Sequence, residues 1–441
     1  MRKLSSLRPV LACIAVVMLF ALTPAASAKW VIKGHGFGHG IGMSQYGAYG
    51  YAQHGRNYKQ ILGHYYKHTK VEKVKPRKIK VLLTSGVGAV SFSGAKKACG
   101  RSLSKSKAYS FASGGSRVVL ENGRGHKLSS CGGTGSTAGG RAITISGHKY
   151  RGGLVATLVS GSLYVINRVG LEDYVQGVVP NEMPASWAQQ ALRVQAVAAR
   201  SYALATRSGS SVFDVYDDTR SQVYGGLQSE QAASNQATRK TAGKVVTYHG
   251  KVATTYFFST SGGHTENIED SFVGSSPVPY LKGVKDRYDG ISPVHKWKVP
   301  LTRSTIASQL SGLFSGRLKK IHVLRRGASP RIVYAKVVGS GGSTKVTGPT
   351  LKARLNLMDS WLNFGKHETG VPAGGGSGGG RHHHGGRHHH HHHGRHHGGP
   401  GGGSGGVGPG GKVPAITSEL RALVQTGPAV QPRPGDMPAV P

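Results

Sequence analysis

Residues 171–204 read LEDYVQGVVPNEMPASWAQQALRVQAVAARSYAL, and this stretch sets the main expectations for the fold. Pro184 suits the first turn of a helix, and polar residues interrupt the chain little from there to about Ala205. The apolar residues that recur at helical spacing on one face are Trp187, Ala191, Val194, Ala198 and Tyr202. We therefore predict a long, mostly buried helix from Pro184 to about Ala205.

Glu182 lies just before this predicted helix, within the apolar context VVPNEMP. Desolvation there would raise its pKa toward the range useful for proton transfer at neutral pH. The residues also allow a second interpretation, in which Glu182 caps the helix N-terminus and the helix dipole lowers its pKa. Of the 18 carboxylates, 12 lie between Glu172 and Asp289, which fits either a general acid or local charge pairing. Both interpretations of Glu182 stay open at this point.

The sequence on either side mixes helical and strand patterns. Ser44 and Asn57 are predicted N-caps of two helices within residues 44–69. Residues 75 to about 166 alternate apolar and polar side chains between Gly and Ser turns, which is typical of strands. Strands are also predicted in KVVTYHG, in KVATTYFFST and in the hairpin formed by KKIHVLRRG and RIVYAKVVG. The fold class predicted is therefore α+β.

The two ends of the chain differ from this globular part. Residues 1–28 combine a basic start, a run of 13 apolar residues and the pattern Ala26-Ser27-Ala28, which predicts a secretory signal peptide. Residues 369–412 are a Gly/His-rich linker that cannot bury a core, and residues 413–441 form a Pro-rich tail. The globular region is thus 29–368, with about 75–150 as a β-rich accessory insertion. No later segment is apolar enough to span a membrane.

Charge and cysteine content indicate where the chain works. The formal charge of +39 becomes +36 once Arg2, Lys3 and Arg8 leave with the signal peptide. Such a field favours polyanions, and export makes anionic wall polymers rather than nucleic acid the expected partner. Cys99 and Cys131 then lie in an oxidising compartment, where one disulfide is expected and two free thiols are the alternative. We predict a secreted, wall-associated protein.

Several motifs together resemble the SpoIID/LytB family of cell-wall proteins. The run 171–204 is similar to the core of that family, and GHGFGHGIGMSQYGAYGYAQHG, at 34–55, is similar to its glycine-histidine motif. Further similar motifs are SQVYGG from Ser221, YFFSTSGGHTEN from Tyr256, PYLKGV from Pro279 and, more weakly, LKARLNLMDSWLNF up to Phe364. They span most of Trp30 to Phe364, and residues 75–150 lie outside them.

The resemblance implies cleavage of peptidoglycan glycan strands by a lytic transglycosylase. One Glu, here Glu182 by its place in the motif, protonates the glycosidic oxygen and then takes a proton from the muramic acid 6-hydroxyl. A single carboxyl therefore suffices, whereas ordinary glycosidases use a pair. The family also contains non-catalytic enhancers that bind peptidoglycan and stimulate an amidase partner. A third possibility is an exported polyanion-binding protein whose His-rich tail holds metal.

The resemblance also implies substrate contacts. Arg200 matches a family arginine, but 18 residues of helix span ~27 Å, so it would hold another sugar or a structural carboxylate rather than touch Glu182. Tyr280 and Lys282 resemble residues near the family's catalytic Glu, with an ordinary strand end as the alternative. The other expected contacts come from the remaining motifs: His39, Ser44, Gln45, Gln222, Tyr224, Ser259 and Ser261.

We expect no cofactor and no metal in the catalytic domain. If residues 34–42 are extended, His35 and His39 lie ~13 Å apart, too far to share an ion. Some relatives bind zinc through His and Cys after the catalytic helix, but 206–230 contains neither residue type. The glycines instead predict a close approach by another strand or a sugar chain. The 11 His within 381–397 allow metal binding, charging below pH ~6.5, or a solvated linker.

The order of the motifs differs from the usual family order. Here the glycine-histidine motif comes first, whereas it usually follows the segment that resembles LKARLNLMDSWLNF. We therefore predict a circular permutant, in which the residues near Trp30 and Phe364 are neighbours in space.

Overall fold

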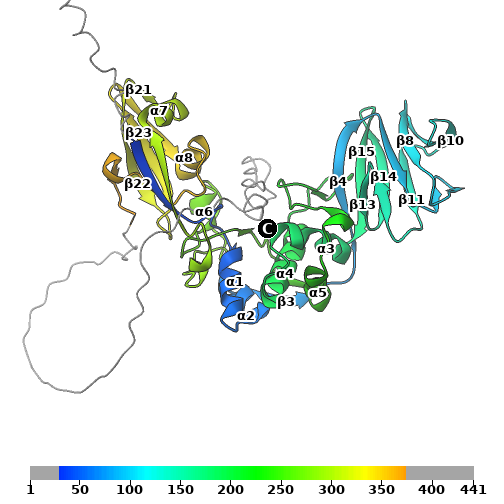
Figure 1. Cartoon of the computed structure of the whole chain (residues 1–441), viewed down its shortest axis with the longest axis horizontal. Helices are drawn as coiled ribbons and strands as arrows, with labels where there is room; N and C mark the ends of the chain where they lie inside the picture. Colours follow the sequence, from blue (N-terminus) through cyan, green and yellow to red (C-terminus); the bar gives the residue numbers. More distant parts are fainter. Residues whose placement is uncertain (1–28, 374–441) are drawn as a thin grey trace, which may run out of the picture.

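The structure is a computed structural model that describes residues 29–373 (Figure 1). The predicted signal peptide, the His-rich run and the Pro-rich tail lie outside the described residues. Figure 1 shows three bodies in a row: a β-rich body at one end, a central group of helices, and a second mixed body at the other end. The predicted α+β mixture is therefore observed. No described helix is long and apolar enough to cross a membrane.

The β-rich body consists of two sheets, of seven strands (order β16-β4-β15-β14-β11-β6-β7) and six strands (order β10-β9-β8-β5-β12-β13). Their core includes Phe92, Phe111 and Leu154, which are almost completely buried. The strands are β4 (Lys78–Val87), β5 (Ala89–Ser93), β6 (Lys97–Ala98), β7 (Arg101–Ser102), β8 (Tyr109–Gly114), β9 (Arg117–Asn122), β10 (Lys127–Ser130), β11 (Thr134–Ala138), β12 (Ile143–Ile145), β13 (His148–Tyr150), β14 (Gly153–Val159), β15 (Ser162–Gly170) and β16 (Val215–Tyr216).

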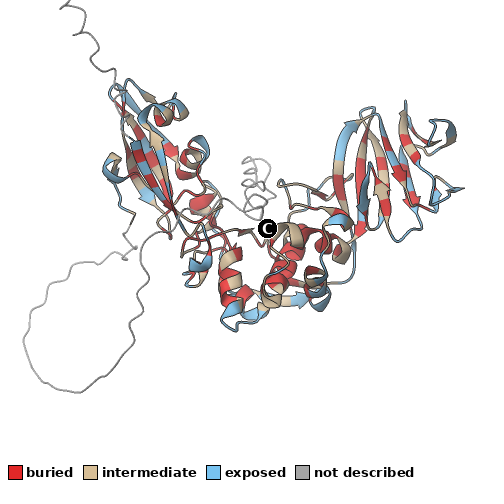
Figure 2. Cartoon of the chain, viewed as in Figure 1, coloured by how far each residue is buried: buried red, intermediate tan, exposed pale blue. Residues whose placement is uncertain are grey.

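The central body is built on two helices, α3 (Leu171–Glu182), which follows β15 directly, and α4 (Gln189–Ala205). Figure 2 shows how much of both helices is buried. Around them lie β2 (Met43–Ser44), α1 (Gln45–Gln53), α2 (Tyr58–Tyr65), β3 (Lys70–Lys73), η1 (Gly226–Ser229), α5 (Ala232–Lys240), β17 (Lys244–Tyr248), β18 (Lys251–Val252), β19 (Phe257–Phe258), α6 (Ile268–Ser271) and η2 (Asp289–Ile291).

The predicted N-caps of the two early helices are confirmed. Ser44 accepts a hydrogen bond from the Gly47 amide at the start of α1. Asn57 begins α2 with a capping box, in which its side chain and that of Gln60 each bond the other's backbone amide. These caps satisfy amide groups that would otherwise lack partners at the first turn.

The predicted start of the long helix at Pro184 is wrong. Helix α3 ends at Glu182 and α4 begins only at Gln189, so residues 183–188 form an irregular link. A proline disfavours helical backbone in the residue before it, and Met183 accordingly has an extended conformation (φ −145°, ψ 131°). Pro184 therefore ends one helix instead of opening the next.

The third body holds the two ends of the described chain. A three-stranded sheet orders β20 (Lys296–Thr302), β1 (Lys29–His35) and β25 (Leu362–Asn363), and a five-stranded sheet has the order β21-β24-β23-β22-β26. The predicted hairpin is confirmed as β22 (Leu318–Arg326) with β23 (Ile332–Gly339). The other elements are α7 (Arg303–Gln309), β21 (Phe314–Ser315), β24 (Gly342–Thr347), α8 (Gly348–Arg354), η3 (Gly365–His367) and β26 (Glu368–Gly370).

Trp30 and Phe364 are neighbours, as predicted. Strand β1 pairs with β25, and the ring centroids of Trp30 and Phe364 lie 6.5 Å apart. Both side chains are almost completely buried in the core of the third body. The core of the third body therefore contains residues from both ends of the described chain.

A disulfide joins Cys99 and Cys131, which lie 32 residues apart in the β-rich body. Replacing both cysteines by serine should destabilise this body by about 3–4 kcal/mol, because the unfolded chain regains the entropy of the open loop. Hydrogen exchange resolved by segment is the measurement. We expect faster exchange in β6 to β11 and unchanged exchange in α3 and α4. Unchanged exchange in β6 to β11 would contradict the prediction.

Candidate active site around Glu182

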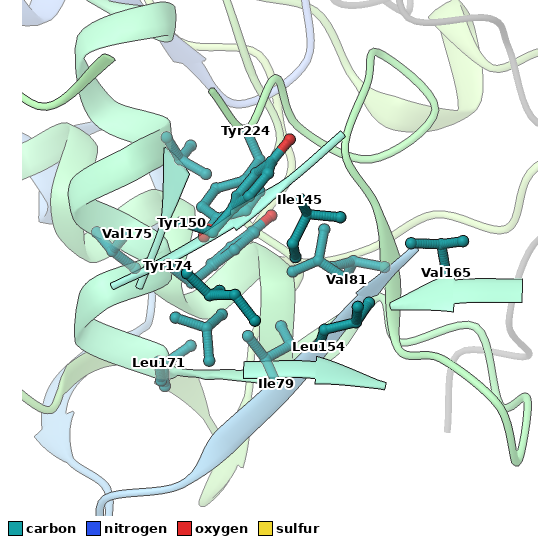
Figure 3. Close-up of a cluster of buried hydrophobic side chains, with 14 of the residues drawn as sticks. Ile79, Val81, Ile145, Tyr150, Leu154, Val165, Leu171, Tyr174, Val175 and Tyr224 are labelled. Carbon is teal, nitrogen blue, oxygen red and sulfur yellow. The ribbon is translucent and has the colours of Figure 1, made fainter. Parts of the chain in front are cut away.

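Glu182 is the last residue of helix α3, and residues near the start of that helix pack against the β-rich body. Figure 3 shows Leu171, Tyr174 and Val175 of α3 packed with strand residues of the β-rich body. At the other end of the helix, Nε2 of Gln45 donates a 2.7 Å hydrogen bond to the main-chain oxygen of Glu182. The predicted site residue Gln45 therefore touches the candidate catalytic residue, through its backbone.

Glu182 is partly exposed as a residue, but its carboxyl group is poorly solvated. Desolvation raises its pKa from 4.5 to about 7, while a 3.1 Å hydrogen bond from the Val223 amide to Oε1 opposes the rise. Within residues 29–373 no cation forms an ion pair with it. The group is therefore close to half protonated at neutral pH.

The alternative in which Glu182 caps a helix N-terminus is wrong. Glu182 is the last residue of α3, so the helix end beside it carries the partial negative charge of the dipole. That charge disfavours the carboxylate, and it acts in the same direction as the desolvation. The position of Glu182 at a helix C-terminus was not predicted, because the break at 183–188 was not anticipated from the sequence.

Aromatic side chains gather on the segments next to Glu182. Trp187, in the link after α3, stacks on Tyr49 with ring centroids 4.5 Å apart and meets the ring of Tyr46 edge to face at 4.8 Å. Tyr202 of α4 is close enough for the Glu182 charge to raise its pKa, although burial is the larger cause. Trp187 was predicted on a buried helix face, and the structure instead leaves it partly exposed in the link after α3.

Asp217 is a second titratable group here that the sequence analysis did not single out. Burial and the neighbouring Asp218 raise its pKa to about 6. Glu182 and Asp217 both raise the pKa of the Tyr174 hydroxyl, after the larger effect of burial, so both lie near that group. The only signal in the sequence was the concentration of acids between Glu172 and Asp289.

Arg200 lies away from the surface, with its side chain completely buried. Its guanidinium donates two hydrogen bonds to Glu172, of 2.9 and 2.6 Å, and others to the main-chain oxygens of Ala196 and Lys244. Of the two alternatives left by the sequence, the structural carboxylate is the one observed. The contact of Arg200 with a sugar, expected from the resemblance, is not supported by this geometry.

His39, Ser44 and Ser261 are held in internal hydrogen bonds. Nδ1 of His39 accepts from the Ile41 amide, so Nε2 carries the proton and donates to the Phe257 carbonyl; desolvation lowers the His39 pKa to about 3. Ser44 donates to Asp289, and the Ser261 hydroxyl accepts from the Gly263 amide. These three side chains position the glycine-histidine segment, and both ring nitrogens of His39 are already used.

The remaining predicted contacts divide between buried and accessible positions. Gln222 donates to the Tyr174 hydroxyl and Tyr224 to Asn167, and both residues are buried beneath the site. The Ser259 hydroxyl bonds that of Thr260. The Tyr280 hydroxyl accepts from the Thr254 amide, and Lys282 pairs with Glu269. None of these contacts brings Tyr280 or Lys282 to the Glu182 carboxyl.

The glycines of residues 34–42 accommodate protein rather than a separate ligand. Gly36 and Gly42 have φ of 76° and 72°, and a Cβ on them would lie 2.6 Å from the Thr260 oxygen and 2.3 Å from the Tyr256 oxygen. The segment is not one extended strand, because β1 ends at His35. The sequence predicted that either another strand or a sugar chain lies against this segment. The structure shows protein there, because residues 256–266 occupy the space.

Among residues 29–373 no group of three His, Cys, Asp or Glu side chains is placed to hold a metal ion.

We predict that Glu182→Gln changes how stability depends on pH. The folded pKa of about 7 lies above the ordinary 4.5, so the native state binds more protons between these values and loses stability as the pH rises. Glutamine removes this loss, which is on the order of 2–3 kcal/mol. Urea unfolding from pH 5 to 8 should give a flatter curve for the variant. Glu266 and Asp286 also have pKa values of about 7 and titrate in both proteins. Parallel curves would contradict the assignment.

We also predict that Arg200 stabilises the fold. Arg200→Met removes both bonds to Glu172, which is partly exposed and keeps the Gly243 amide as a donor, so the free energy of unfolding should fall by about 1–3 kcal/mol. Arg207→Met is the matched control, because Arg207 is exposed near the end of the same helix and its loss should cost less than about 1 kcal/mol. An Arg200 variant that is as stable as the parent but no longer binds cell wall would instead indicate a substrate role.

Comparison with known proteins places this site in a family. Residues 159–248, which include Glu182, match the family model described as SpoIID, stage II sporulation protein. The amidase enhancer of Bacillus subtilis is 42% identical over 132 residues, which cover 30% of this chain and 17% of that protein. Stage II sporulation protein D of the same organism is 34% identical over 168 residues, 34% of this chain and 48% of that protein. An uncharacterised protein of Brachyspira hyodysenteriae is 39% identical over 145 residues, 32% of this chain and 39% of that protein. The matched part covers less than half of each of these relatives, and the family model places residues 159–248 in the SpoIID family.

Proposed function

We propose that the chain is an exported, wall-associated lytic transglycosylase that cleaves peptidoglycan glycan strands. The observation that carries this proposal is the Glu182 carboxyl, which belongs to a partly exposed residue, has no cationic partner among the described residues and has a pKa of about 7. A group with a pKa near the working pH is suited to give a proton in one step and take one in the next.

The reaction then proceeds with Glu182 as the only proton carrier. Protonated Glu182 gives its proton to the glycosidic oxygen, and the bond from that oxygen to C1 of the muramic acid unit breaks. The resulting carboxylate takes the proton of the 6-hydroxyl of the same sugar, and that oxygen bonds to C1. The products are a 1,6-anhydro end and a free 4-hydroxyl, and Glu182 is protonated again. No water is consumed, so a second carboxylate to activate water is not needed.

The aromatic residues near Glu182 support a carbohydrate substrate. Trp187 has one face stacked on Tyr49 and is partly exposed, so it can offer apolar surface to the C–H groups of a pyranose ring. Since Trp187 lies in the link 183–188, which directly follows Glu182, a ring held on the indole would be kept near the carboxyl. The +36 charge after signal removal favours the anionic wall around the substrate.

A second candidate function is supported by one of the relatives. The protein named amidase enhancer is 42% identical over the matched residues, so a non-catalytic role that stimulates an amidase is the alternative. In that role Glu182 would bind peptidoglycan or the partner enzyme without transferring a proton.

We further propose that the chain is a circular permutant of the usual family order. The pairing of β1 with β25 supports this, because linking the ends of residues 29–364 would join adjacent strands of one sheet.

The proposed function predicts that Glu182→Gln abolishes cleavage. The variant keeps the shape of the side chain but has no transferable proton, which should reduce the rate by about 10²–10⁴. The measurement is the release of anhydro-ended muropeptides from purified peptidoglycan and from glycan stripped of stem peptides, by mass spectrometry. Glu121→Gln makes the same change on a strand of the β-rich body and should retain full activity.

Two outcomes would contradict the enzyme assignment. Equal release by parent and Glu182→Gln would make Glu182 a structural residue. No release by the parent from either substrate, together with stimulation of an added amidase, would favour the enhancer.

A further inference from the structure

A pocket of about 330 Å³ lies in the third body, apart from Glu182. It is lined by Lys33 and His35 of β1, Trp361, Asn363 of β25 and Ala373. These strands pack in the core that contains Trp30 and Phe364, whereas α3 packs in the core of the β-rich body. The volume is at the small end of the range for ligand sites and is enough for one sugar unit or a short peptide.

The pocket offers hydrogen-bond donors that the protein does not use. Oδ1 of Asn363 accepts a 2.8 Å bond from the Gly365 amide, which fixes the side-chain amide and leaves its NH₂ group without an acceptor in residues 29–373. The Lys33 ammonium likewise has no carboxylate or carbonyl partner in that range. No acidic residue lines the pocket. A ligand with acceptor oxygens, and a carboxylate above all, satisfies these donors.

Four exposed lysines on the sheet strengthen this preference. Lys33 lies directly opposite Lys298 in the register of β1 and β20, and Lys296 lies opposite His35. Lys29 is on the same strand and face as Lys33. Like charges directly opposite on antiparallel strands destabilise a sheet, and no carboxylate pairs with any of the four in the described part of the chain. The resulting positive field attracts an anion to the pocket.

One wall of the pocket is aromatic and rigid. The rings of His35 and Trp361 are stacked, with centroids 4.8 Å apart and planes 14° from parallel. The guanidinium of the buried Arg331 lies 5.6 Å from the Trp361 ring and is itself fixed by Asp359. Trp361 therefore keeps its position, and its partly exposed indole can pack against the C–H face of a sugar.

We propose that this pocket is a second, non-catalytic wall-binding site that takes a carboxylate-bearing muramic sugar. The sugar ring packs on Trp361, its carboxylate meets Lys33, and an acceptor oxygen meets the Asn363 amide. The identity of the ligand rests on the proposed function, since it assumes a peptidoglycan strand. The segment that continues from Ala373 is a poor match for these donors, because residues 374–411 contain Arg and His but no carboxylate side chain.

The test is a titration of the full chain followed by the indole N–H signals in NMR, with the Trp361 signal assigned from Trp361→Phe. The probes are the disaccharide of N-acetylglucosamine and N-acetylmuramic acid, the N-acetylglucosamine dimer, which has no carboxylate, and a free stem tetrapeptide. We expect the muramic disaccharide to shift the Trp361 signal and the other two probes to bind at least about 10-fold more weakly. Lys33→Gln should weaken binding by about 10-fold and remove most of its salt dependence.

The matched control is Lys319→Gln, an exposed lysine on β22 of the same body, which should leave the titration unchanged. A Trp361 signal that does not move, or that moves equally in the Lys33 variant, would overturn the proposal. An equal response to the tetrapeptide would overturn the sugar assignment. A Trp361 response in the parent chain, together with no release of anhydro ends by that same chain, would mean that the cleavage assignment fails while the pocket stands.

Discussion

The carboxylate of Asp289 holds together the segments on which the candidate site depends. It accepts hydrogen bonds from the Ser44 hydroxyl at 2.7 Å, from the Ser261 and Gly262 amides at 2.8 and 2.9 Å, and from Nδ1 of His295 at 2.9 Å. Burial alone would raise its pKa, but the bonds from His295, Ser44 and the two amides lower it, so the group is ionised. Ser44 is thereby fixed as the cap of α1, and Gln45 next to it reaches the backbone of Glu182.

The surroundings of Asp289 explain further features of the glycine-histidine motif. The adjacent Asp286 is buried beside that charge, and both effects raise its pKa to about 7. A Cβ on Gly47 would lie 2.1 Å from both Asp286 Oδ2 and the Tyr65 hydroxyl, so only glycine fits there. One carboxyl is thus kept ionised by donors, and the pKa of the second is raised by burial and by the neighbouring charge. Glu182 follows the second pattern, with desolvation as the main cause.

Local rules in the sequence predicted much of the fold. The caps at Ser44 and Asn57, the β22–β23 hairpin and the proximity of Trp30 to Phe364 all depend on nearby residues or on motif order. The break at 183–188 was missed because Pro184 fits the start of one helix as well as the end of another. The roles of Asp289 and Trp187 were not predicted from the sequence, since they depend on partners that are distant in sequence. Arg200 is the instructive case, because its motif position suggested substrate and only its pairing with Glu172 showed a structural role.

The central claim is that the environment at the end of α3 tunes Glu182 for proton transfer at neutral pH. The most direct measurement is the pKa of that one side chain, from the carboxyl carbon chemical shift of ¹³C-labelled glutamate followed against pH, with the signal assigned by Glu182→Gln. The account predicts a midpoint near the value of about 7 set by desolvation. A midpoint near 4.5, the ordinary value, would contradict it.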